Sequence, residues 1–204
     1  LYDICDAVYT IPLPTRTKQE RIISLLTTRK ADIQLRLASE AFEQKLITLL
    51  KNETFDVVQF SGIELGSYLS VIQAQGTSAK IIYDALNAEA DLQHVIYTID
   101  RQSIKRLPIA IYSYLQAQRI KRFEEWLCKS VDAVIAVSDE DKAILVQYRG
   151  AAIFVMSNGI FVDEYTPPSE SNRHTNQLVY TGKMDYRPNV DAIEWFASSI
   201  LPHI

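Results

Sequence analysis

Short, almost wholly apolar runs alternate along the chain with segments of helical periodicity, and this alternation most constrains the fold. The central runs are continuously apolar, which is typical of strands covered on both faces in a parallel sheet. The predicted strands occupy residues 6–13, 56–60, 80–84, 133–137, 152–156 and 177–181. Strands that alternate with helices indicate an α/β fold built on a doubly wound parallel sheet.

Helical spacing fills the gaps between these runs. Apolar residues three and four apart predict one helical face at Leu35, Ala38, Phe42, Leu46 and Leu49, and another at Ile120, Phe123 and Leu127. Ser138, which precedes three acids, predicts a helix start, because a hydroxyl and carboxylates suit the free N–H groups there. Pro188 predicts the start of the last helix.

The polar segment 163–177 contains two prolines and has no periodicity, so it indicates a linker near residue 165. We expect a first domain over residues 1–165, a linker over 166–176 and the start of a second domain over 177–204. The chain does not begin with Met and has no polar tail, and we expect it to be a truncated piece of a longer protein.

Composition excludes several classes of protein. The net charge of −4 argues against a nucleic-acid binder, and no apolar run is long enough to span a membrane. Cys5 and Cys128 cannot form a disulfide framework, which favours a cytoplasmic location. The three histidines lie far apart, and the chain has no Walker loop and no dinucleotide glycine fingerprint.

Polar side chains follow two of the central strands. Ser61 and Gly62 end the first, and Asp84, Asn87 and Glu89 follow the second. Ligands of open α/β sheets bind beyond the carboxyl ends of the strands, where such groups can hold sugar hydroxyls or exchange protons. The alternative is an ordinary turn with helix caps, Ser61 among them.

Asp139 and Asp141 form an Asp-x-Asp pair, which could hold a divalent cation on a sugar-nucleotide diphosphate. We favour a helix-start role for them, because the pair directly follows the cap at Ser138.

Residues 101–129 carry seven Lys or Arg and two acids in an otherwise acidic chain. Such a stretch is either a solvated helix face or a surface for anionic headgroups, which would make the protein peripheral to the inner face of a membrane.

Gly182 and Lys183 end the last predicted strand. A glycine admits a ligand close to the backbone, and a lysine beyond it can meet a phosphate, although a turn with a surface lysine is the alternative.

Seven stretches together resemble the group 1 (family four) glycosyltransferases of the GT-B class, which use nucleotide-sugar donors. They are FDVVQ (55–59), YDALNAE (83–89), RFEE (122–125), VDAVIAVSDED (131–141), SNGI (157–160), EYTP (164–167) and YTGKMDYRPNVDAIEWF (180–196). Each stretch is weak alone, but their shared order and spacing cover most of the chain.

The resemblance implies two Rossmann-like domains that face each other across a cleft. Residues 1–165 would be the acceptor domain without its first strands, and the chain from 177 would begin the donor domain. The substrates would be a nucleotide sugar and a sugar, lipid-linked or small-molecule acceptor, with no nucleic acid, no metal and no other cofactor. We expect this piece alone to be inactive.

The resemblance also implies roles for single residues. Gly182 and Lys183 match the glycine and basic residue that meet the donor diphosphate. Ser138 matches a serine that borders the cleft, beside the acceptor-side candidates Ser61, Gly62, Asp84, Asn87 and Glu89. No catalytic residue is assigned, because the family often has a histidine where this chain has Leu86.

Two other functions stay open. One is a metal-dependent transferase that uses Asp139 and Asp141. The other is a non-catalytic Rossmann-like binding module, which the Leu86 departure favours.

Overall fold

The computed structural model describes residues 4–166, 177–185 and 187–204. The chain divides into two compact units, residues 1–159 and 160–204. The described part of the first unit carries four strands, β1 (Val57–Ser61), β2 (Lys80–Ala85), β3 (Ala133–Ala136) and β4 (Ala152–Val155). The predicted linker over 166–176 lies, apart from its first residue, outside the described residues.

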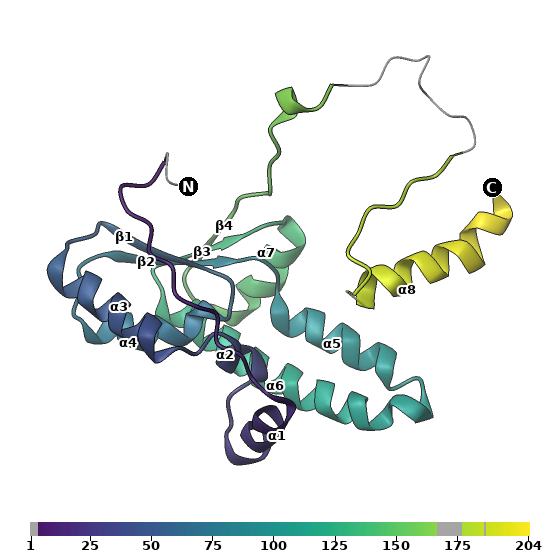
Figure 1. Ribbon diagram of the computed structural model, residues 1–204, viewed down its shortest axis with the longest axis horizontal. Coiled ribbons are helices and arrows are strands. Elements are labelled where there is room, and N and C mark those ends of the chain that lie inside the picture. The colour runs from purple at the N-terminus through teal and green to yellow at the C-terminus, as the bar shows by residue number, and fades with distance from the viewer. Residues whose placement is uncertain (1–3, 167–176, 186) are drawn as a thin grey trace. The chain divides into compact units, whose positions relative to one another are not determined.

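The four strands form one sheet in the order β1-β2-β3-β4, and every neighbouring pair is parallel. This confirms the α/β class and is consistent with a Rossmann-like fold. The four central predicted strands are confirmed to within one residue at each end. Because the order runs in one direction, right-handed crossovers place the connecting helices on the same face of the sheet, and Figure 1 shows α3, α4 and α6 on one side of it.

Helices and short turns fill the rest of the described chain. The first unit contains α1 (Lys18–Thr27), α2 (Asp32–Arg36), α3 (Glu40–Asn52), α4 (Leu69–Ala74), α5 (Glu89–Asp100), α6 (Leu107–Ser130) and α7 (Asp139–Leu145). It also contains the 3₁₀ turns η1 (Leu65–Tyr68), η2 (Ile104–Arg106) and η3 (Val146–Tyr148). The second unit contains η4 (Val162–Glu164), α8 (Arg187–Trp195), a π-helical turn (Phe196–Ile200) and a 3₁₀ turn (Leu201–His203).

The starts of three helices can be explained by the capping or first-turn residues found there. Ser138 is confirmed as the cap of α7, where its hydroxyl accepts a hydrogen bond from the N–H of Asp141. Pro188 is confirmed near the start of α8. The helical face expected from Leu35 to Leu49 is interrupted, because Ser39 caps a new helix and accepts from the N–H of Phe42.

The core lies between the helices and one face of the sheet. Phe60, Tyr83 and Val134 point to this face from three neighbouring strands, and the rings of Phe60 and Tyr83 stack at 5.3 Å. The predicted face of α6 is confirmed, because Ile120, Phe123 and Leu127 are all buried in the same cluster.

The opposite face of the sheet is open to solvent. Val57 and Phe154 lie on this face and are exposed, Phe154 by 60%. Ile82 on β2 and Ile135 on β3, the latter paired with Phe154 in the register, lie on the same face and are half-buried. The continuous apolar runs predict that both faces of the sheet are buried. Within the described residues, however, helices cover only one face of the sheet.

Two predicted strands are wrong. Residues 6–13 form no strand, and none of the strands in the described residues pairs with them. Pro12 also supplies no N–H donor for a sheet. Residues 177–181 form no strand either, because no strand is described in residues 160–166, 177–185 and 187–204 that could pair with them.

Gly150 marks a close approach of the backbone on the way into β4. Its neighbour Ala151 donates its N–H to the carbonyl of Cys128 at the end of α6, at 2.7 Å. A Cβ at Gly150 would overlap the carbonyl oxygen of Cys128 and lie 2.5 Å from its carbonyl carbon. These are backbone atoms of a packed helix, so they cannot turn away as a side chain would.

We therefore expect Gly150→Ala to lower the free energy of unfolding by about 2–3 kcal/mol. Gly159→Ala is the matched control, because a Cβ there would meet no atom within 4 Å. The control should change stability by less than about 1 kcal/mol. Urea denaturation followed by circular dichroism measures both, and equal stabilities of the two variants would contradict the close approach.

Candidate functional site

The loops that follow β1 and β2 meet at one edge of the sheet. Ser61 lies opposite Asp84 in the register, and its hydroxyl donates to Oδ2 of Asp84 at 2.7 Å. Gly62 donates its N–H to the backbone carbonyl of Asp84 at 2.9 Å and has a positive φ of 85°. The alternative of Ser61 as a helix cap is wrong, because its hydroxyl serves Asp84 and the next helical turn begins only at Leu65.

The β2–α5 loop brings Asn87 and Glu89 to the same edge. The side-chain amide of Asn87 donates to Oε1 of Glu89 at 3.1 Å. Neither residue caps α5, because the cap position is Ala88, which has no side-chain acceptor. The loop is held instead by Asp141 of α7, whose Oδ1 accepts the N–H of Ala88 at 2.9 Å.

Ser138 and Asp141 connect the end of β3 to this loop. The hydroxyl of Ser138 donates to Oδ2 of Asp141 at 2.5 Å and accepts from the N–H of the same residue. Both carboxylate oxygens of Asp141 therefore accept hydrogen bonds within the protein. Asp139 lies in the first turn of α7 and is exposed. Among the described residues, no group of three or more His, Cys, Asp or Glu could hold a metal ion.

The carboxylate of Glu124 lies beneath the site, where it replaces the missing cap of α5. Its Oε1 accepts the N–H of Glu89 at 2.8 Å, and its Oε2 accepts the hydroxyl of Tyr148 at 2.8 Å. Glu124 is fully buried. Sequence reasoning assigned it no role, although an acid on the apolar face formed by Ile120, Phe123 and Leu127 is a signal that could have found it.

Burial raises the pKa of two carboxyl groups here. The pKa of Glu124 is raised from 4.5 to about 7, because burial outweighs the hydrogen bonds from Tyr148 and the backbone. The pKa of Glu89 is also raised, first by burial and then by the nearby carboxylate of Glu64, against the opposing effects of Asn87 and Arg36. A carboxylate with a raised pKa is a better proton acceptor, so Glu89 is suited to acid–base chemistry.

The edge as a whole carries more negative than positive charge. Glu64, Asp84, Glu89 and Asp141 supply carboxylates, and Arg36 pairs with Glu64 at 3.1 Å. Carboxylate and amide oxygens in this arrangement accept hydrogen bonds from hydroxyl groups. The structure thus brings together all six acceptor-side residues predicted from the sequence, namely Ser61, Gly62, Asp84, Asn87, Glu89 and Ser138.

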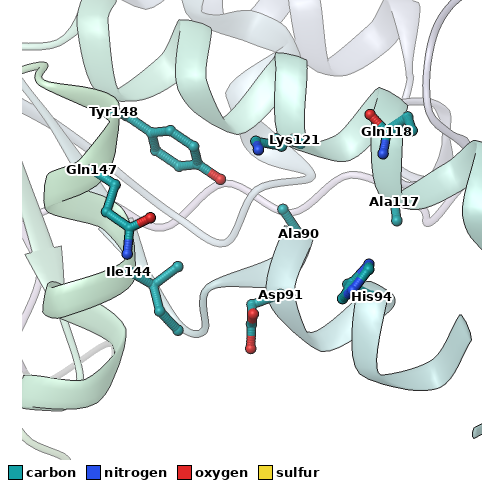
Figure 2. A pocket seen from close by; sticks show the side chains of 9 residues that line it. All are labelled: Ala90, Asp91, His94, Ala117, Gln118, Lys121, Ile144, Gln147 and Tyr148. Atoms are coloured by element: carbon teal, nitrogen blue, oxygen red, sulfur yellow. The ribbon is translucent and has the colours of Figure 1, made fainter. Parts of the chain in front are cut away.

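A cavity of about 260 Å³ lies between α5, α6 and the α7–η3 segment (Figure 2). Its lining includes Asp91 and His94 from α5 and Lys121 from α6. Tyr148 also lines it, and the hydroxyl of this residue donates to the buried Glu124. The cavity and the strand-end site therefore share one structural support.

Gly182 and Lys183 belong to the second unit. A Cβ at Gly182 would lie 2.9 Å from the ring of Tyr180, so the turn is tight. The side-chain amide of Asn189 in α8 donates to the carbonyl of Lys183 at 3.1 Å. The ammonium of Lys183 is 3.2 Å from Asp185, and both side chains are exposed, so this surface pair is weak and readily exchanged for another anion.

We expect Glu124→Gln to change how stability depends on pH. The pKa of Glu124 is higher in the folded protein (about 7) than the ordinary 4.5, so the folded state retains the proton longer. Stability should therefore fall by about 3 kcal/mol as the pH rises from 4.5 through 7, and Glu124→Gln should remove this decrease.

Urea denaturation at a series of pH values measures this difference. Glu125→Gln is the matched control, because Glu125 is the adjacent residue but pairs with Lys129 at the surface. The control should keep the decrease of the wild type. Parallel pH profiles for wild type and Glu124→Gln would show that Glu124 is not the titrating group.

Within residues 4–166, 177–185 and 187–204, no helix is both long and apolar enough to cross a bilayer. Comparison with known proteins found no matching protein-family model, no matching curated protein and no matching solved structure.

Proposed function

We propose that this chain is the acceptor-side part of a glycosyltransferase, which moves a sugar from a nucleotide-sugar donor to a hydroxyl acceptor. One observation carries the proposal. Four residues from sequence stretches that resemble group 1 glycosyltransferases, Asp84, Asn87, Glu89 and Ser138, meet at the carboxyl edge of a parallel sheet, together with Ser61 and Gly62 at the end of β1. Ligands of open α/β sheets bind at this edge. Residues 177–204 would then begin the donor domain.

Glu89 is the residue best suited to accept the proton of the acceptor hydroxyl. Its pKa is raised by burial and by Glu64, and Asn87 fixes the position of its Oε1. Asp84 and Ser61, linked at 2.7 Å, supply neighbouring groups that can orient the sugar by hydrogen bonds. Glu89 would thus take the proton while the oxygen attacks the donor sugar.

Lys183 is the residue best suited to meet the donor diphosphate. Its ammonium is exposed and shares its charge only with Asp185 among the described residues. A cation there would stabilise the leaving nucleotide as negative charge develops on it. The metal-dependent alternative has less support, because both oxygens of Asp141 accept hydrogen bonds that hold the β2–α5 loop.

We expect Glu89→Gln, in the longer protein that contains this chain, to lower kcat by about 100-fold or more. The backbone N–H that meets Glu124 is unchanged, so the fold should persist. The kcat of the wild type should rise as the pH passes through the raised pKa of Glu89, because the ionised carboxylate is the base. The kcat of the variant should not show this rise. Release of nucleotide from a panel of nucleotide sugars and acceptors measures it.

Glu125→Gln is the control for that experiment and should keep the wild-type rate. A Glu89→Gln variant that keeps most of the activity would place the base elsewhere. Reversible sugar binding without any transfer by the wild type would favour the binding-module alternative instead.

We expect Lys183→Ala in the same longer protein to raise the donor KM by about tenfold, which corresponds to one lost charge-assisted contact of about 1.4 kcal/mol. Asp185→Ala is the matched control, because it breaks the same surface pair and leaves the cation free. Initial rates at varied donor concentration measure both, and equal KM values for the two variants would contradict a donor contact.

A further inference from the structure

The turn η2 and the first half of α6 carry a row of exposed aliphatic side chains. Ile104, Leu107, Ile111 and Leu115 follow one another at steps of three, four and four, which places them along one side of the η2–α6 segment. We call these four residues the outer stripe. All four are exposed, Ile104 by 92%.

The outer stripe is not the surface by which α6 packs into the protein. The buried side of this part of α6 is formed by Ser113, Gln116 and Ala117, which lie on the opposite side of the helix. The α5–α6 hairpin extends beyond the sheet, and its turn lies at the far end (Figure 1). Four aliphatic side chains on a projecting element are unfavourable in water, and such a patch marks an interaction site.

The charge around the outer stripe has one sign. Arg101 and Lys105 are exposed beside it. Between residues 92 and 123 the only carboxylate is Asp100, which is fully buried and lies 3.7 Å from Arg106. The first turn of α6 also contains no acidic residue, so nothing there offsets the positive helix end.

Two other cations of the basic stretch have internal roles. Arg119 donates to the backbone carbonyls of Lys30 and Leu25, and Lys129 pairs with Glu125 at 2.7 Å. These cations stabilise the fold, so the free positive charge is concentrated toward the end of the hairpin and on Lys121 and Arg122.

We propose that the outer stripe and its flanking cations bind the surface of an anionic lipid membrane. Aliphatic side chains enter the boundary between headgroups and acyl chains, while Arg101 and Lys105 meet the lipid phosphates. A second copy of the chain fits less well, because a symmetric dimer through this patch would bring like charges together. The α5–α6 hairpin projects from the sheet, so its end can insert into a bilayer without contact from the rest of this unit. The proposal is independent of glycosyl transfer.

Sedimentation with lipid vesicles tests this on the 204-residue chain. Vesicles of phosphatidylcholine with a quarter of phosphatidylglycerol should bind the chain, whereas pure phosphatidylcholine should bind it about 10-fold or more weakly. Binding to the anionic vesicles should fall sharply in about 1 M NaCl, where charges are screened over about 3 Å. Equal binding to both kinds of vesicle, or to neither, would overturn the proposal.

Variants separate the two contributions. Ile104→Ser and Lys105→Gln should each weaken binding about 5-fold, because one aliphatic contact or one cation is lost. The matched controls are Val146→Ser, an exposed aliphatic residue on η3, and Lys51→Gln, an exposed cation at the end of α3. Controls that weaken binding as much as the stripe variants would show adsorption without a defined site.

A fluorescent probe measures insertion directly. An environment-sensitive dye on Ile104→Cys, in a Cys5→Ser background, should shift to the blue on anionic vesicles, whereas the same dye on Val146→Cys should not. Cys128 is buried and should not react. Analytical ultracentrifugation without lipid tests the alternative that the outer stripe forms a dimer. A dimer that Ile104→Ser abolishes, without vesicle binding, would assign the outer stripe to self-association and overturn the proposal.

Discussion

The buried carboxylate of Glu124 is the constraint on which the rest of the site depends. A carboxylate without exposure is costly unless hydrogen bonds replace its water. Here the N–H of Glu89 and the hydroxyl of Tyr148 do so, both at 2.8 Å. These two bonds tie α6 to the start of α5 and to η3. The position of the Glu89 backbone, and hence of its side chain at the strand edge, therefore depends on a residue on another helix.

The same principle holds for the other loops at this edge. Asp141 of α7 holds Ala88, and Ser61 of β1 holds the side chain of Asp84 on β2. Each of these hydrogen bonds joins residues more than twenty positions apart in the chain. The conformation of each loop therefore depends on a residue outside that loop. An acceptor bound here would meet groups that are already in position, and less binding energy would be spent on ordering them.

The features of the fold that depend on neighbouring residues in the sequence could be predicted, and those that depend on distant residues could not. The continuous apolar runs at the four central strands, and the cap at Ser138, are local signals and were predicted correctly. Residues 6–13 and 177–181 are also rich in apolar residues, but no strand in the part of the chain that the structure describes pairs with them, and pairing is not visible in a local window. The convergence of Ser61, Asp84 and Glu89 followed from the parallel topology, whereas Glu124 was missed because its partners come from other elements.

Among the exposed apolar surfaces, the open face of the sheet and the outer stripe differ in the charge beside them. The open face of the sheet carries Phe154 and Val57 beside both an acid, Asp84, and a base, Lys80. Arg101 and Lys105 are exposed beside the outer stripe, and the one carboxylate in the sequence between residues 92 and 123 is the buried Asp100. The whole chain has a net charge of −4, so an anionic bilayer would repel the chain as a whole while it attracts exposed cations such as Arg101 and Lys105 at the hairpin end. In the proposed membrane binding, the hairpin end would therefore face the bilayer, because exposed aliphatic side chains and cations occur there together.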